Sequence, residues 1–159
     1  MLCNSRQKWD FIPELNLQGE QIEIVDKIKI VGFVLRKDMK TWANTAYITG
    51  KAYKRMWLIR RLKSLGATTE QLLDTLEKQV LSVLWLGAPA WYCQVTQAEK
   101  TSLDRVAKVA LKIILGQHYD GFQNSVQHCK ITKPTERLEK MTKRFAIKSA
   151  QHPKFSTWF

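Results

Sequence analysis

Acidic residues are scarce in this sequence, and their scarcity sets its electrostatic character. Only 14 aspartates and glutamates stand against 26 lysines and arginines, which gives a formal net charge of +12 at pH 7. A chain with this balance is a poor partner for basic ligands and favours polyanions, with nucleic acid first and acidic membrane surfaces second. The charge alone does not choose between these two kinds of partner.

Cysteines and long apolar runs are also rare. The three cysteines lie far apart and form no C-x-x-C pair: Cys3, Cys93 and Cys129. This excludes a disulfide scaffold and favours a reducing compartment. The most apolar run, 80–91, is too short to span a bilayer, and charged residues interrupt the N-terminal segment where a signal peptide would need an apolar core. We expect a soluble, intracellular protein with no membrane partner, in the nucleus or the cytoplasm.

Catalytic motifs are missing as well. No two aspartates are adjacent, as they are where polymerases hold two catalytic metal ions. All seven glycines are isolated, so none builds a phosphate-binding loop, and no G-x-S-x-G or H-E-x-x-H motif occurs. We therefore expect no enzymatic activity and no cofactor.

The histidines offer one nominal metal site. His118 and Asp120 have the H-x-D spacing of a two-histidine, one-carboxylate iron centre, and His128 or His152 could supply a third ligand. Such a centre needs a β-barrel to hold its ligands, and no strand pattern surrounds this segment, so we interpret it as a loop near a helix end. His128 and Cys129 lack partners for zinc, and Cys93 is interpreted as a packed small apolar residue.

The first quarter of the chain has β or extended character. Residues 1–14 carry little pattern. Residues 15–25 alternate apolar and polar on both sides of Gln18-Gly19, which predicts a β-hairpin, and Ile28 to Leu35 suggest a third strand with a bulge at Gly32. Three strands are too few for an independent sheet. They must be the edge of a larger sheet or pack on the helices that follow.

The remainder predicts helices. Residues 41–65 favour a helix that ends at Gly66, and capping-box spacings at Thr68 and Thr96 start two more. The first of these has an apolar seam and stops before Pro89, and the second is closed by Gly116. The apolar seam of the helix after Thr68 consists of Leu73, Leu76, Val80, Val83 and Gly87. The apolar stripe of the helix after Thr96 consists of Leu103, Val106, Ala107, Ala110, Ile113 and Ile114.

One further main helix completes the prediction, and a shorter helical segment precedes it. Residues 121–129 predict a short helix, and Pro134 opens a last one along which Leu138, Met141 and Phe145 recur until His152-Pro153 ends it. The expected fold class is α+β, mainly α: a short β-hairpin or three-stranded piece at 15–36, then a bundle of about four helices at 41–159.

Basic residues cluster in two places. Residues 51–65 hold six cations and no acid, and their apolar residues fall on three arcs rather than one face: Ala52, Met56 and Ile59; Tyr53 and Trp57; Leu58, Leu62 and Leu65. The second cluster runs from Lys130 to Lys154, where Lys133, Arg137, Lys140 and Arg144 recur at helical spacing. Each cluster is open to two interpretations, a solvated helix face or a face that binds phosphates.

The order of these segments resembles a known family. The stretch LNLQGEQIEIVDKIKIVGFVLRKDMKTWANTAYITGKAYKRMWLIRRLKSLGATTEQLLD, the helix RVAKVALKIILG and the closing HPKF are similar to the end of the palm and the start of the thumb in reverse transcriptases of non-LTR (LINE-type, Jockey-like) retrotransposons. The resemblance covers roughly residues 10–159. It implies that 15–36 is palm-like and 41–159 thumb-like.

The resemblance also implies a role. In that family the catalytic aspartates lie upstream of this region, so the chain resembles a non-catalytic fragment that begins at an internal methionine. Thumb helices of the family grip the backbone of the template–primer duplex. The positions carried over are Lys51, Lys54, Arg55, Arg60 and Arg61, with Arg105 and Lys108 behind them. Lys140 and Arg144 of the second basic cluster join them as candidate nucleic-acid ligands.

The sequence departs from the family in two places. It has Val80-Leu-Ser-Val-Leu-Trp85 where the family has Val-Arg-Ser-Val-Leu-Glu, and Thr-Lys-Pro-Thr before Glu136 where a Ser-Glu-Arg-Arg run is usual. Separately, the hairpin-to-helix region is similar to a short N-terminal segment of an AlkB-type tRNA-modifying protein, but no residue here supports dioxygenase or methyltransferase chemistry. A small helical interaction module of unknown oligomeric state is the rival hypothesis.

Overall fold

A computed structural model describes residues 16–151 and contains two small hairpins followed by helices. The strands are β1 (Asn16–Leu17), β2 (Glu20–Gln21), β3 (Lys27–Ile30) and β4 (Phe33–Arg36). The α-helices are α1 (Trp42–Ser64), α2 (Thr69–Thr75), α3 (Ser82–Trp85), α4 (Ala88–Trp91), α5 (Gln97–Leu115), α6 (Phe122–His128) and α7 (Pro134–Ala150). A π-helix, η1 (Leu76–Leu81), joins α2 to α3, and η2 (Tyr92–Gln94) and η3 (Gly116–His118) are 3₁₀ turns. The expected class, α+β and mainly α, is confirmed. The predictions for residues 1–14, for His152-Pro153 and for the closing HPKF lie outside the described residues.

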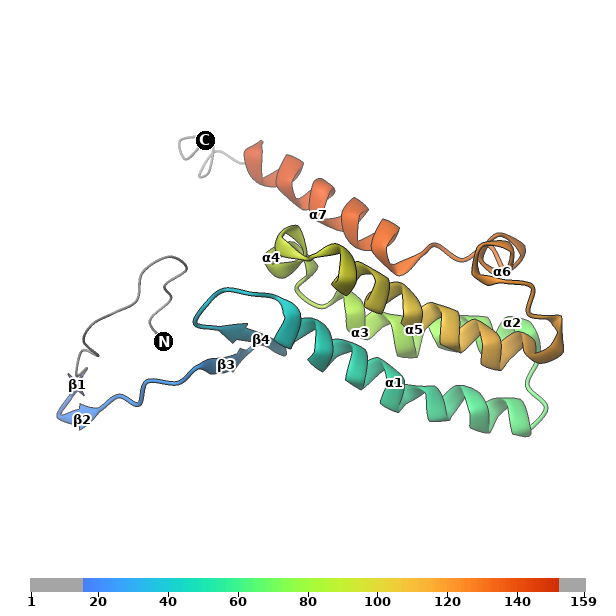
Figure 1. Cartoon of the computed structure of the whole chain (residues 1–159), viewed down its shortest axis with the longest axis horizontal. Helices are drawn as coiled ribbons and strands as arrows, with labels where there is room; N and C mark the ends of the chain where they lie inside the picture. Colours follow the sequence, from blue (N-terminus) through green and yellow to red (C-terminus); the bar gives the residue numbers. More distant parts are fainter. Residues whose placement is uncertain (1–15, 152–159) are drawn as a thin grey trace.

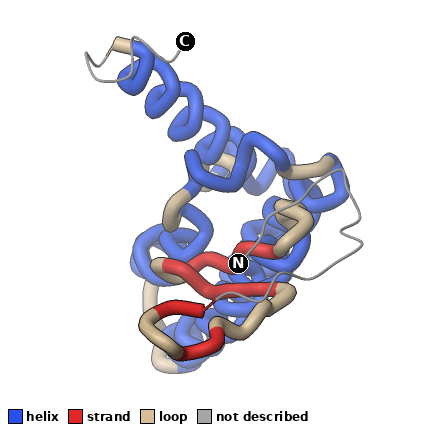
Figure 2. Tube along the Cα trace, turned by 90° about the vertical axis from the view of Figure 1, so that its left-hand side faces the viewer, coloured by secondary structure: helices blue, strands red, loops and turns tan. Residues whose placement is uncertain are grey.

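The N-terminal strands form two separate antiparallel hairpins rather than three strands. The predicted turn at Gln18-Gly19 is confirmed by positive φ at both residues, but β1 and β2 are only two residues each and exposed. The predicted bulge at Gly32 is wrong. Val31 and Gly32, with φ of 47° and 90°, form a two-residue turn that pairs Ile30 with Phe33. Both hairpins lie toward the end of the bundle where α1 begins (Figures 1 and 2).

The first long helix, α1, forms the centre of the core. Ala52, Met56 and Ile59 are completely buried, so this arc, one of the three, faces the interior. α1 runs in the same direction as α5 (Figure 1), and both ends of the pair are tied. At one end, Thr41 Oγ1 donates to Glu99 Oε1 at 2.8 Å. At the other, Lys63 Nζ donates to the carbonyl of Ile114 at 3.0 Å.

The helical segment after α1, formed by α2, η1 and α3, contains an irregularity that the sequence pattern did not predict. The predicted start at Thr68 is confirmed by a complete capping box. Leu76, Val80 and Val83 of the predicted seam are buried together with Leu72, Leu81 and Leu84, whereas Leu73 is half-buried and Gly87 lies beyond the helix in a left-handed conformation. The predicted seam is therefore partly wrong, because the π-helical turns of η1 take more residues per turn and shift the buried face.

The other helices begin and end close to their predicted positions. The box at Thr96 opens α5, which ends at Gly116, and Pro134 stands in the first turn of α7. One expectation fails on α7. Leu138 is buried and Met141 half-buried, but Phe145 is 57% exposed because the C-terminal half of α7 extends past the helices on which its first half packs (Figure 1).

Candidate nucleic-acid interface

The outward side of α1 carries three of the predicted cations. Lys54, Arg60 and Arg61 are all exposed, and the sequence holds no carboxylate between Asp38 and Glu70. Within residues 16–151 none of the three forms an ion pair. The helix presents them because its buried arc is filled by small and aliphatic residues, which leaves the long cationic side chains to extend into solvent.

Two other predicted cations on α1 contact the protein itself. The Nζ atom of Lys51 lies 5.3 Å from the centre of the Tyr47 ring, a cation–π contact. Arg55 Nη1 donates to the backbone carbonyl of Gln79 at 2.7 Å, so this guanidinium binds the π-helical segment η1. Both side chains stabilise the fold, which leaves them less free to bind a ligand than the three outward cations.

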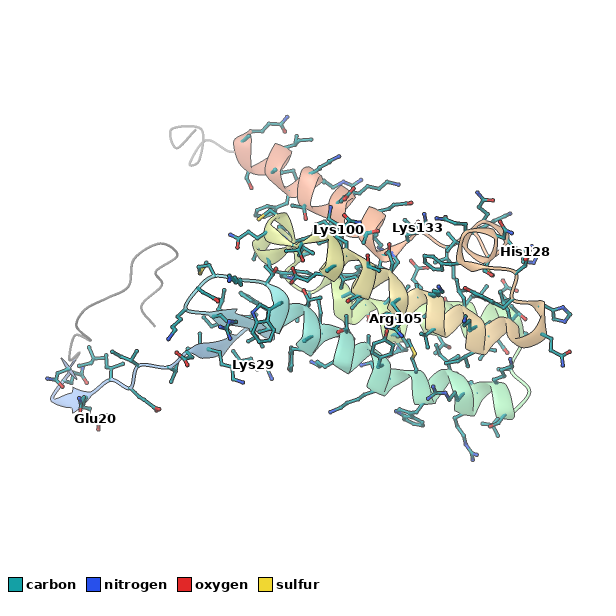
Figure 3. The ribbon with its side chains drawn as sticks, viewed as in Figure 1. Glu20, Lys29, Lys100, Arg105, His128 and Lys133 are labelled. Atoms are coloured by element: carbon teal, nitrogen blue, oxygen red, sulfur yellow. The ribbon has the colours of Figure 1, made fainter. Side chains whose placement is uncertain are left out.

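Arg105 joins α5 to the cationic side of α1. It lies where α5 faces α1 (Figure 3) and lines a hollow of about 360 Å³ together with Thr49 and Tyr53 of α1. Burial raises the pKa of the Tyr53 hydroxyl, and the nearby positive charge of Arg105 opposes that shift. Lys108, one turn further along α5, is exposed. The structure therefore places Arg105 beside α1, whereas Lys108 lies on the part of α5 that faces α6 and α7.

A larger groove of about 660 Å³ lies on the other side of Arg105, between α5, α6 and α7. Its cations are Lys100, Arg105, Lys108, Lys112 and Lys133. Lys100 pairs with Glu139 at 3.0 Å, and Figure 3 shows Lys100 and Lys133 at this boundary. The sequence pattern missed Lys100 and Lys112, because this groove exists only once α6 and α7 pack beside α5.

The carboxylates of this groove are already held by protein groups. Asp104 accepts hydrogen bonds from the Thr135 backbone N–H at 3.0 Å and from its hydroxyl at 2.9 Å. Burial raises the pKa of Asp104, against the lowering effect of these two bonds. A hydrogen bond from Lys100 holds the pKa of Glu139 below its usual range. The groove thus remains net positive.

The second basic cluster forms only part of the single face that its spacing predicted. Arg137 pairs with Glu77 of η1 and lies 4.9 Å from the Trp85 ring centre, while Lys133 reaches the groove beside α5. Lys140 and Arg144 are exposed. They share the arc of α7 that carries Arg137 rather than the arc that contacts α5, so the structure does not bring them together with the cations of α1.

The remaining candidates behave as follows. His118 and His128 are exposed, and among residues 16–151 no three histidine, cysteine, aspartate or glutamate side chains gather as metal ligands. Cys93 is exposed, so the expectation that it is packed is wrong. No helix in the described part combines the length and apolarity needed to cross a membrane.

Comparisons of the chain with protein-family models, with curated proteins and with solved structures gave no match.

Proposed function

We propose that the chain is a non-catalytic, thumb-like helical module that binds the phosphate backbone of nucleic acid without sequence preference. The resemblance to the thumb of non-LTR reverse transcriptases supports this role. The observation that carries it is a set of five exposed cations on α1 and α5, with no ion pair to any of them among the described residues: Lys54, Arg60, Arg61, Arg105 and Lys108.

The rival hypothesis is a protein-interaction module whose charge is incidental. It predicts that surface cations pair with neighbouring acidic residues, as Lys78 pairs with Asp74 along α2 and η1. The surface of α1 offers no such acid. Keeping unopposed cations together costs repulsive energy, and a polyanion relieves it while releasing counterions from its own backbone.

The expected salt dependence of binding follows from the number of cations that contact phosphates. If each of the five cations neutralises one phosphate, the logarithm of the association constant should fall with the logarithm of salt with a slope of about −4.5. A rise from about 50 to about 200 mM salt should then weaken binding roughly 500-fold. The assay is fluorescence anisotropy with a labelled primer–template duplex.

The double variant Arg60→Glu and Arg61→Glu should lower the slope to about −2.7, which leaves only a roughly 40-fold loss over the same salt range. The matched control is Lys27→Glu with Lys130→Glu, which makes the same change in net charge at two exposed sites away from α1 and α5. Absence of binding at about 50 mM salt, or equal effects of the two double variants, would refute the proposal.

A further inference from the structure

The exposed side of α1 carries aromatic rings as well as cations. Trp57 is 63% exposed and Tyr53, one turn before it, is 37% exposed, although the same helix buries Ala52, Met56 and Ile59 completely. The exposure of this indole does not mean that the helix is turned away from the core, because the buried arc of the same helix is already filled. Exposed aromatic side chains of this kind mark surfaces that bind a partner.

The neighbours of Trp57 decide what kind of partner suits it. On a helix surface a residue contacts those three and four positions away. For Trp57 these are Tyr53, Lys54, Arg60 and Arg61, all of them exposed. The indole is therefore surrounded by a second aromatic ring and three cations, and Arg105 of α5 lies beyond Tyr53 in their shared hollow.

An apolar protein surface fits this arrangement poorly. Covering Trp57 with it would remove water from Lys54, Arg60 and Arg61 without supplying a counter-charge. A base-paired duplex fits only in part, because its bases are stacked on each other and offer phosphates but no free ring faces. An unpaired strand supplies both groups, a base to stack on an aromatic ring and phosphates for the flanking cations.

We infer that α1 binds single-stranded nucleic acid, with unpaired bases stacking on Trp57 and Tyr53 while Lys54, Arg60, Arg61 and Arg105 hold the adjoining phosphates. This rests on the proposed backbone-binding function and adds a preference for unpaired bases. Phe145 of α7 provides the contrast. It is 57% exposed, but its neighbours three and four positions away are Met141, Thr142, Lys148 and Ser149, so it has one flanking cation where Trp57 has three.

The experiment uses the full 159-residue chain and two labelled 12-nucleotide strands of DNA. One is a mixed-sequence strand, and the other has the same phosphates with abasic residues at all positions. Wild-type protein should bind the strand with bases roughly tenfold more tightly than the abasic strand, since stacking of a base on an aromatic residue contributes about that much. Trp57→Ala should reduce this difference to about twofold or less while leaving the salt slope on the abasic strand unchanged.

Two further variants separate stacking from other roles of Trp57. Trp57→Leu keeps an apolar side chain but no ring face, and should behave like Trp57→Ala. Phe145→Ala, a change at an exposed aromatic residue elsewhere, should bind both strands like wild type. Circular dichroism at 222 nm confirms that each variant is folded, as expected for a side chain that is mostly in solvent.

This experiment separates failure of the stacking inference from failure of the proposed backbone-binding function. Equal, salt-dependent binding of both strands by wild type would overturn the stacking inference and leave backbone binding intact. Absence of binding to either strand and to duplex would refute both. A Trp57→Leu variant that binds like wild type, or a dimer in sedimentation that Trp57→Ala abolishes, would assign Trp57 to an apolar contact and overturn the inference.

Discussion

The carboxylate of Glu99 is the contact on which the pairing of α1 and α5 most depends. Its Oε2 accepts from the backbone N–H of Thr96 at 2.9 Å and from the Thr96 hydroxyl at 2.6 Å, which completes the capping box of α5. Its Oε1 accepts from the hydroxyls of Thr41 at 2.8 Å and Thr45 at 3.1 Å, across the boundary with α1. The two threonines are buried. Glu99→Ala removes all four bonds at once.

The expected loss can be worked out from these contacts. Losing a capping interaction costs about 1 kcal/mol. Each buried hydroxyl left without its acceptor costs about 1–3 kcal/mol, nearer the lower figure here because Thr41 Oγ1 also lies 3.5 Å from the Gln94 carbonyl. Glu99→Ala should therefore destabilise the protein by about 2–4 kcal/mol. Gln71→Ala, which removes the same position of the exposed capping box at Thr68, should cost only about 1 kcal/mol.

The assay is urea unfolding at pH 7, followed by circular dichroism at 222 nm. Equal losses for Glu99→Ala and Gln71→Ala would refute the inter-helix contribution. A double-mutant cycle of Glu99→Ala with Thr45→Val should give a coupling energy of about 1 kcal/mol, because the two residues are in contact. A coupling near zero would show that the bond between these side chains contributes nothing to stability.

The pH dependence provides an independent check on Glu99. Burial works against its ionisation, but hydrogen bonds from Thr96, Thr41 and Thr45 outweigh it and hold the pKa of Glu99 below the usual 4.5. Because the folded pKa is the lower one, this stabilisation is present above the unfolded pKa and is lost as pH falls through the folded pKa. The stability gap between wild type and Glu99→Gln should thus narrow on acidification. A gap that widens would contradict the reasoning.

Three further predictions test other parts of the fold, two by urea unfolding and one by titration. Lys63→Met should cost about 1 kcal/mol and speed hydrogen exchange in the last turn of α5, whose carbonyls Lys63 binds at 2.5 and 3.0 Å; unchanged exchange there would contradict it. Gly32→Ala should cost more than Gly19→Ala, since both have positive φ but only at Gly32 would a Cβ lie 2.7 Å from Leu86; equal costs would argue against that clash. Burial raises the pKa of Tyr92 to about 12, so absorbance at 295 nm should show this hydroxyl ionising well after an ordinary tyrosine, and an ordinary titration would refute it.

Local signals in the sequence predicted most helix ends correctly. The capping boxes at Thr68 and Thr96 and the stops at Gly66 and Gly116 each depend on residues a few positions apart, so the local sequence is enough to determine them. The turn at Gly32 was misread because a single apolar run on either side of one glycine fits a bulged strand and a hairpin equally well. The choice between a bulged strand and a hairpin depends on the backbone angle φ of Val31, which the sequence does not specify.

Contacts over long separations account for the other differences. The spacing of 133–144 predicted one basic face, but Lys133 precedes α7 and lines the groove beside α5, and Arg137 pairs with Glu77, sixty positions away. Arg55, which we expect to bind phosphate, also donates to the backbone carbonyl of Gln79 in the π-helical segment, a contact that the sequence pattern does not predict. The exposed cations Lys54, Arg60 and Arg61 followed from the arcs of one helix, whereas the groove beside α5 required knowing how α6 and α7 pack.

The parallel course of α1 and α5 has an electrostatic consequence. Each helix has a dipole with about half a positive charge at its N-terminus and half a negative charge at its C-terminus, so two parallel neighbours place like poles together. Glu99 lies at the two positive poles, where α1 has no acidic residue in its own first turn, and Lys63 lies at the two negative poles. One carboxylate and one ammonium therefore each serve two helices. Because acidic residues are scarce in this chain, Glu99 is the counter-charge that allows α1 and α5 to pack in the same direction.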